Sequence, residues 1–73
     1  MEQISIRALR IDKGFSQNSM AEAIEAKMRA LGNTDYHLSG IGYSLKERGV
    51  NPFTFNEVRA LCDICGVSIA VIK

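Results

Sequence analysis

The apolar residues of this chain recur at steps of three and four positions almost from end to end, which is the spacing of amphipathic α-helices. Ile6, Leu9 and Lys13 follow these steps, and Gly14 comes next, where the end of a helix favours glycine. The pattern therefore predicts a first helix over roughly residues 3–13.

A second helix is predicted from Gln17 to Leu31, and its start is well marked. Ser16 is a favourable N-cap, and the apolar residues Phe15 and Met20 on either side of it are spaced as a hydrophobic staple. The apolar stripe expected to face the core consists of Met20, Ala21, Ile24, Met28 and Leu31. Gly32 follows this stripe, and the helix is expected to end there.

A third helix is predicted near residues 36–47, after the turn-forming stretch 32–35. The residues expected to face inward, at helical spacing, are Leu38, Ile41 and Leu45. Two glycines, Gly40 and Gly42, fall within this helix, where glycine is unfavourable. They suggest that a neighbour, either another helix or a ligand, approaches closely here.

The fourth helix has the clearest start in the chain. Thr54 and Glu57 form a T-x-x-E capping box, and Gly66 closes the helix. The stripe expected to be buried consists of Val58, Leu61, Cys62 and Cys65. Ser68 can cap one last turn over residues 69–72. With five helices and no credible strand, the sequence predicts a compact, all-α, five-helix bundle.

Length and composition fit one small globular domain over residues 1–73. The chain is 47% hydrophobic, which is typical of a folded domain and not of a disordered tail. Its net charge of +1 excludes a polybasic protein that wraps nucleic acid. The charge is nevertheless uneven: the first helix carries three cations and one acid, and residues 46–56 carry two cations and one acid. We therefore expect a modest positive rim around the third helix.

Membrane and secretory signals are missing from the sequence. No apolar run approaches the roughly 20 residues that a membrane span needs. The N-terminal segment has an acid at position 2 and no long apolar stretch, unlike a signal peptide. We therefore expect a cytoplasmic protein that does not engage a membrane.

Candidate catalytic or metal-binding groups are few. Cys62 and Cys65 form a C-x-x-C at the end of the predicted fourth helix, whereas a redox motif favours a helix N-terminus. A zinc site would need two further ligands, and His37 is the only histidine. We therefore expect reduced, buried cysteines, no metal or cofactor, no small-molecule substrate and no enzymatic activity.

Several short stretches share their order and punctuation with a known family. They are residues 6–10 (IRALR), 13–17 (KGFSQ) with 20–21 (MA), 39–42 (SGIG), 47–49 (ERG) with 51–52 (NP), and 61–68 (LCDICGVS). Together they resemble lambda-repressor-like (Xre/Cro-type) helix-turn-helix domains over nearly the whole chain. The resemblance implies a five-helix fold with a helix-turn-helix, in which the third helix is the recognition helix.

The resemblance implies a small phage- or prokaryote-type transcriptional regulator that binds double-stranded operator DNA. The third helix would lie in the major groove and contact the bases there. The second helix would anchor to phosphate at its start, through Gln17 and Asn18. The residues implied to face DNA are Tyr36, His37, Ser39, Gly40, Tyr43 and Ser44, with Lys46, Arg48 and Asn51 beside phosphates.

The resemblance also implies two structural contacts. Arg10 matches a family position that pairs with the acid of the Glu-Arg-Gly loop, here Glu47, and so would tie the first helix to that loop. The alternative is that Arg7, Arg10 and Lys13 form only a solvated face of the first helix. The apolar tail would form the interface of a homodimer through Ile69, Val71 and Ile72, since four consecutive apolar residues cannot all point inward. Folding back onto the core is the alternative for this tail.

Two features leave a second hypothesis open: a helix-turn-helix module (a modulator or antirepressor) that binds a partner repressor and not DNA. Sixteen residues separate Ile24 from Ile41, more than the family usually has. The expected reading face holds no Arg, Lys, Asn or Gln before Lys46, although these side chains make the commonest base-specific contacts. Tyr36 and Tyr43, seven residues apart and hence on one face, are open to half-buried packing or to groove contact.

Overall fold

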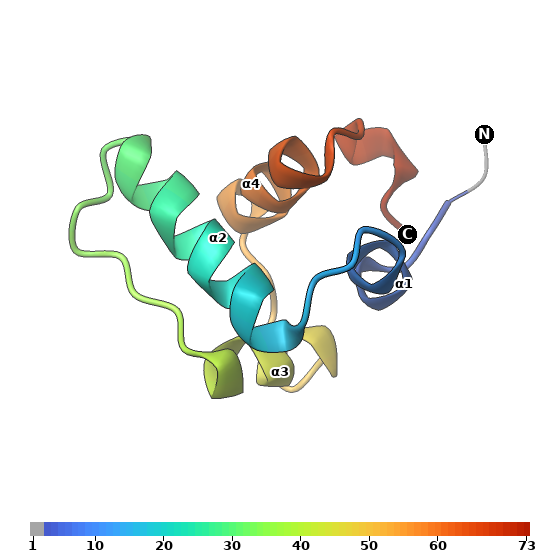
Figure 1. Ribbon diagram of the computed structural model, residues 1–73, viewed down its shortest axis with the longest axis horizontal. Coiled ribbons are helices and arrows are strands. Elements are labelled where there is room, and N and C mark those ends of the chain that lie inside the picture. The colour runs from blue at the N-terminus through green and yellow to red at the C-terminus, as the bar shows by residue number, and fades with distance from the viewer. Residues whose placement is uncertain (1–2) are drawn as a thin grey trace.

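The computed structural model describes residues 3–73, which form four α-helices and one short 3-10 turn. The elements are α1 (Ile6–Asp12), α2 (Gln17–Ala30), α3 (Gly40–Glu47), α4 (Phe55–Cys65) and η1 (Ile69–Val71) (Figure 1). No strand is present among these residues, so the predicted all-α fold is confirmed. Met1 and Glu2, which begin the segment expected not to be a signal peptide, lie outside the described residues.

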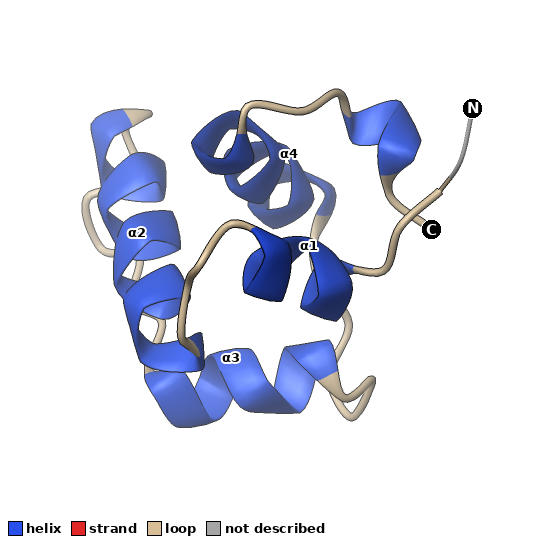
Figure 2. Cartoon of the chain, turned by 45° about the vertical axis from the view of Figure 1, so that its right-hand side comes forward, coloured by secondary structure: helices blue, strands red, loops and turns tan. Residues whose placement is uncertain are grey.

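The predicted fifth helix is wrong, because residues 69–72 contain only a single 3-10 turn, which Ser68 caps. After this turn the backbone leaves the helical path and bonds to the N-terminal segment. The N–H of Ile4 donates to the carbonyl of Val71 at 2.7 Å, and the N–H of Lys73 donates to the carbonyl of Ile4 at 3.0 Å. The segments around Ile4 and Ile72 therefore lie side by side, as both ribbon views show (Figures 1 and 2).

Side-chain caps begin the helices, and the predicted starts of α2 and α4 are confirmed. Ser16 and Ser19 exchange side-chain and backbone hydrogen bonds at the start of α2, as Thr54 and Glu57 do at the start of α4. α4 closes at Gly66, whose φ of 71° lies in the left-handed region that favours glycine. α2 ends at Ala30, one residue before its predicted end.

Two predicted boundaries are wrong. α1 is shorter than residues 3–13 because Ser5 caps it by accepting the N–H of Ala8, while Ile4 is paired with the tail. α3 begins at Gly40 and not near residue 36, because Ser39 is its N-cap and accepts the N–H of Gly42. The consequence is that Tyr36 lies in a loop before α3 and not on the helix.

The loop over residues 31–39 is held against α2 by two side chains of that helix. Arg29 Nε donates to the carbonyl of Tyr36 at 2.8 Å, and the N–H of Leu38 donates to Glu25 Oε1, also at 2.8 Å. The additional residues between Ile24 and Ile41 therefore form a long connection anchored along α2, in place of a tight turn.

The core gathers residues from all four helices. Its fully buried side chains, each without exposed area, include Met20 and Ile24 of α2, Tyr43 of α3 and Leu61 of α4, and Leu9 of α1 adds to them. The ring of Tyr43 packs edge-on against Phe53, with the ring centroids 5.9 Å apart. Figure 2 shows α2 along the left side, α3 at the bottom, α4 at the top and α1 between them.

The predicted inward stripe of α3 is partly wrong. Ile41 is 78% exposed, whereas Tyr43 has no exposed area. The late start of the helix explains why Tyr43 and not Ile41 is buried. Leu38 lies in the loop before Ser39 and is buried there. Within the helix, Tyr43 and Glu47, four residues apart, then face inward. Leu31, also expected in the core, is 65% exposed because α2 ends before it.

The C-x-x-C pair behaves as expected for core cysteines. Cys62 and Cys65 are both buried on α4 and neither forms a disulfide. Burial raises the pKa of both thiols, which disfavours the reactive thiolate.

α2 and α3 approach closely at their starts, as expected at Gly40, whereas a Cβ at Gly42 would contact only the neighbouring Ser39 and Leu38 of its own segment. A Cβ placed at Gly40 would overlap the side chain of Asn18. The Cα of Asn18 would lie 3.6 Å from that Cβ. The absence of a side chain at Gly40 thus lets the first turn of α3 lie against the first turn of α2.

Glu57 is a buried acid, only 4% exposed, that joins three segments. It also belongs to the capping box of α4. Its Oε1 accepts from Thr54 N at 2.8 Å and from Lys46 Nζ at 3.0 Å, and its Oε2 accepts from the hydroxyl of Tyr36. Burial by itself raises the pKa of Glu57, but the hydrogen bonds from Thr54, Tyr36 and Lys46 outweigh it and hold the pKa below its ordinary value.

Replacing Glu57 by Ala should therefore destabilise the fold strongly. The change leaves the half-buried hydroxyl of Tyr36 without an acceptor and the ammonium of Lys46 with only the carbonyl of Pro52, and removing one partner of a buried ion pair costs about 3–5 kcal/mol. Urea denaturation of Glu57→Ala beside Glu22→Ala, which removes an exposed glutamate of α2, tests this expectation. Equal midpoints for the two variants would contradict it.

Candidate nucleic-acid interface

The starts of α2 and α3 meet at one place on the surface, where Asn18 lies against Gly40. The first backbone N–H groups of a helix have no acceptor within it. Ser16 and Ser39 cap the N–H groups of Ser19 and Gly42, and the structure provides no protein acceptor for those of Gln17, Asn18, Gly40 and Ile41 within residues 3–73. Two positive helix ends are thus adjacent.

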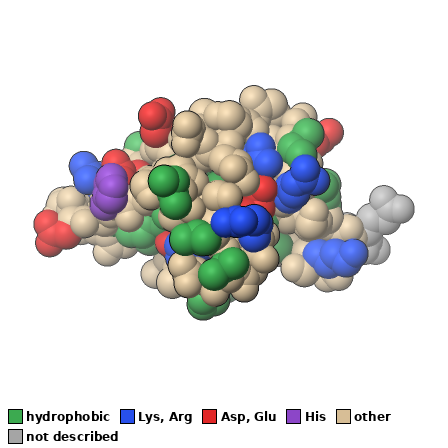
Figure 3. Space-filling view, turned by 90° about the horizontal axis from the view of Figure 1, so that it is seen from below, with side chains coloured by type: hydrophobic (Ala, Val, Ile, Leu, Met, Phe, Trp, Pro, Cys, Tyr) green, Lys and Arg blue, Asp and Glu red, His purple; other side chains and the backbone are tan. Residues whose placement is uncertain are grey.

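One side of α3 points away from the rest of the fold. Ile41 is 78% exposed, Ser44 and Leu45 are partly exposed, and Arg48, the C-cap, is exposed. Their spacing of three, four and seven residues places them on one helix face, here called the outer face of α3. Figure 3 views the molecule from the α3 side and shows hydrophobic and basic side chains next to one another.

The predicted DNA-facing residues fall into three groups. Those at the meeting point or on the outer face of α3, or just beyond it, are Gln17, Asn18, Ser39, Gly40, Ser44, Arg48 and Asn51. Tyr36 and His37 lie in the preceding loop, and there the His37 ring contacts Glu25, with Nδ1 2.7 Å from Oε1.

Tyr43 and Lys46 are turned into the fold. The side chain of Tyr43 is completely buried, so its expected contact with DNA is wrong, and packing is the outcome for both tyrosines. The ammonium of Lys46 bonds to Glu57 and to the carbonyl of Pro52, at 3.0 and 3.1 Å, and is therefore already neutralised. Ile41 and Leu45 of the outer face are absent from the expected set, because their apolar character assigned them to the core.

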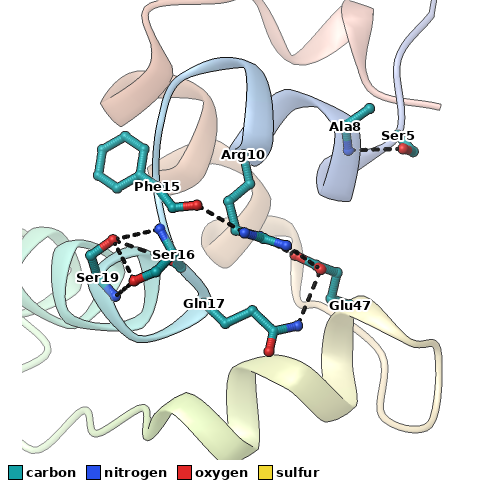
Figure 4. Close-up of polar contacts among 8 residues, drawn as sticks. All are labelled: Ser5, Ala8, Arg10, Phe15, Ser16, Gln17, Ser19 and Glu47. Carbon is teal, nitrogen blue, oxygen red and sulfur yellow. Dashed lines mark hydrogen bonds and ion pairs between the residues drawn. The ribbon is translucent and has the colours of Figure 1, made fainter.

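A buried ion pair fixes the position of α3 relative to α1. Arg10 is 8% exposed, and its Nε and Nη2 donate to the two carboxylate oxygens of Glu47 at 2.8 and 3.1 Å (Figure 4). The third contact of the guanidinium runs from Nη1 to the carbonyl of Phe15 at 2.8 Å. The predicted pairing of Arg10 with Glu47 is confirmed.

Gln17 joins this cluster from the start of α2. Its Nε2 donates to Glu47 Oε1 at 3.3 Å, so the side chain implied to anchor phosphate points toward Glu47 (Figure 4). The hydroxyl of Tyr43 is buried beside the same pair, and no hydrogen-bond partner for it lies within the described part of the chain. α1, α2 and α3 thus converge on one carboxylate.

The pKa values of the cluster follow from this geometry. Burial alone raises the pKa of Glu47, but hydrogen bonds, that from Arg10 above all, hold it below its ordinary value. The hydrogen bond to Glu47 likewise raises the pKa of Arg10. Both groups therefore stay charged at neutral pH.

Ion pairing with acids engages four of the nine cations, Arg10, Lys27, Arg29 and Lys46. Among the described residues, the exposed cations with no acidic partner are Arg7, Lys13, Arg48, Arg59 and Lys73. Of these, Arg48 belongs to the outer face of α3. At the opposite end of that helix, Glu22 and Glu25 line a shallow cleft of about 320 Å³ with Asn18 and Gly40. The positive rim expected around α3 is thus reduced to its C-terminal end.

A cavity of about 500 Å³ lies between residues 32–36 and the start of α4, and the polar groups of Tyr36 and Glu57 that line it bond to each other. Within residues 3–73, no three His, Cys, Asp or Glu side chains are grouped so as to hold a metal ion. None of the helices described combines the length and the apolar character needed to cross a membrane.

No protein-family model matches the chain, and no curated protein or solved structure shows significant similarity to it.

The Arg10–Glu47 pair should make stability depend on pH in the acid range. The pKa of Glu47 in the folded state lies below the ordinary value of 4.5. At pH values between the folded and the unfolded pKa, the unfolded chain therefore binds more protons than the folded protein. The free energy of unfolding should therefore fall as pH drops below about 4.5, and the contribution of Glu47 should be lost as pH falls through its folded pKa.

Urea denaturation of the wild type and of Glu47→Gln between pH 7 and pH 3 measures this contribution. The variant should be less stable at pH 7 and should lose less stability on acidification, because one of the titrating groups is gone. An identical pH dependence in both proteins would contradict the role assigned to Glu47.

Proposed function

We propose that this protein is a small cytoplasmic transcriptional regulator of the phage or prokaryotic type, which binds operator DNA through α3. The observation that carries the proposal is the outer face of α3, which lies free beside the adjacent starts of α2 and α3. An α-helix with its side chains is about 10–12 Å across and so fits a major groove about 12 Å wide, and α3, with eight residues, is about 12 Å long.

The starts of the helices support an arrangement in which α2 lies over the phosphate backbone while α3 enters the groove. The unpaired N–H groups of Gln17 and Asn18 are donors that suit a phosphate oxygen, and the positive end of α2 favours its charge. Arg48 and Asn51, both exposed, supply donors beyond the other end of α3. This division of roles is the one that the lambda-repressor-like resemblance implies.

The proposal includes a homodimer that binds two half-sites. Ile69 of η1 is 38% exposed, whereas Val71 and Ile72 are half-buried and Ile72 packs against the core. The tail thus folds back in part, and Ile69 with the outer edges of Val71 and Ile72 remains as the apolar surface for a second copy. Pairing through this end would repeat α3 on both sides of a two-fold axis.

A second candidate function is binding to a partner repressor in place of DNA. The observation that favours it is the acidic cleft at the start of α3, where Glu22 and Glu25 lie near Gly40. These carboxylates repel phosphate, and a basic protein surface suits them better. In an operator-competition assay, a repressor-binding module would change the occupancy of the operator by its repressor without binding the duplex itself.

Binding to a short random-sequence DNA duplex, followed by fluorescence anisotropy over a series of salt concentrations, tests the DNA hypothesis. Affinity should fall as salt rises, because phosphate contacts release counterions. Arg48→Ala should weaken binding to all sequences alike and lower the slope of log K against log salt by about 1.

Arg59→Ala is the matched control, because it removes an exposed cation from α4 and alters the net charge equally. It should leave the slope unchanged. If the wild type does not bind the duplex even at low salt, DNA is rejected as the partner. If the two variants have equal effects on the salt dependence, α3 is rejected as the DNA-binding element.

A further inference from the structure

The outer face of α3 has an unusual chemistry for a surface that contacts bases. It presents Ile41, Ser44 and Leu45 in succession and reaches a cation only at Arg48. None of the first three side chains offers the paired donors and acceptors with which Arg, Asn or Gln identify guanine or adenine. Whatever this face reads must therefore be recognised mainly by apolar contact.

We infer that Ile41 and Leu45 read the 5-methyl groups of thymine in the major groove. This inference rests on the proposed function and specifies which bases the outer face of α3 selects. The thymine methyl is the one apolar group that the four base pairs display in this groove, and aliphatic side chains contact it directly. Ile41, 78% exposed in the first turn of α3, lies where a helix entering the groove comes closest to the bases.

The spacing of the two side chains fits neighbouring base pairs. Residues four apart on a helix are separated by about 6 Å along its axis, and successive base pairs by about 3.4 Å. Ile41 and Leu45 therefore span about two steps of the duplex. The Ser44 hydroxyl, on the same face, can donate to or accept from either type of base pair and adds little selectivity.

The size of this apolar surface favours DNA over a protein partner. A stable protein interface buries about 800 Å² on each partner and involves about 20–30 residues a side. The outer face of α3 offers two aliphatic side chains, with unpaired backbone donors at one end and the guanidinium of Arg48 at the other. A narrow apolar strip between donors is complementary to methyl groups on a groove floor flanked by phosphates.

Replacing thymine by deoxyuridine tests the inference, because it removes only the methyl group. Duplexes bound by the wild type are selected from a random pool, resynthesised with single dT-to-dU changes, and measured by fluorescence anisotropy. At one or two neighbouring positions the change should lower affinity about fourfold for each methyl lost, the value expected for one buried CH₂-sized group.

Ile41→Ala should abolish the difference between dT and dU at one of these positions. The variant should fold normally because Ile41 is largely exposed, and an unchanged melting temperature verifies this. Val50→Ala is the matched control, since Val50 is 65% exposed but lies outside α3, and it should keep the full difference.

Each alternative outcome is decisive. Equal affinity of the wild type for dT and dU duplexes, or a dT-to-dU difference that persists in Ile41→Ala, would overturn the inference while leaving DNA binding intact. Failure to select any duplex, together with absence of salt-dependent binding, would overturn both the inference and the proposed function, and would direct attention to a protein partner.

Discussion

The bidentate ion pair between Arg10 and Glu47 is the interaction on which the rest of the arrangement depends. Both side chains are buried, and the guanidinium also holds the carbonyl of Phe15, just before α2. A buried charge without its partner is costly, so α1, the start of α2 and the end of α3 are held together as one unit. Gln17 adds a further bond to the same carboxylate. The outer face of α3 is thereby presented on a fixed support, although α3 itself has only eight residues.

A second buried carboxylate, Glu57, completes the support from the other side by joining α4 to the loop before α3 and to Lys46. Together the two clusters use Arg10 and Lys46, two of the nine basic residues, for internal pairing. With a net charge of +1, the chain therefore fits the DNA-binding proposal only if the contacts do not require a broadly positive surface. The proposed contacts depend on helix-start N–H groups, on Arg48 and on apolar side chains, and less on a broadly positive surface.

Much of the fold could be predicted from the sequence, because local signals determine it. The caps at Ser16 and Thr54 and the glycine at Gly66 mark α2 and α4 nearly to the residue, and the burial of Cys62 and Cys65 follows from their stripe. The Arg10–Glu47 pair was accessible through the family resemblance alone.

The start of α3 could not be predicted from the sequence, because several residues in that region are possible caps and only the anchoring of the loop on Glu25 and Arg29 selects Ser39. The exchange of Ile41 and Tyr43 follows from that start, since periodicity does not reveal which of two adjacent faces meets the core. The internal use of Lys46 depends on α4, which lies beyond any local pattern.

The central claim is that the meeting point of α2 and α3, together with the outer face of α3, forms one DNA-contacting surface. Titration of the ¹⁵N-labelled protein with duplex DNA at low salt, followed by ¹H–¹⁵N correlation spectra, tests it most directly because every backbone amide except those of the N-terminus and of Pro52 reports separately. The largest shifts should belong to Gln17, Asn18, Gly40, Ile41, Ser44 and Arg48, while the amides of residues 32–36 and of the second half of α4 should change little. Shifts confined to those other residues, or an unchanged spectrum, would contradict it.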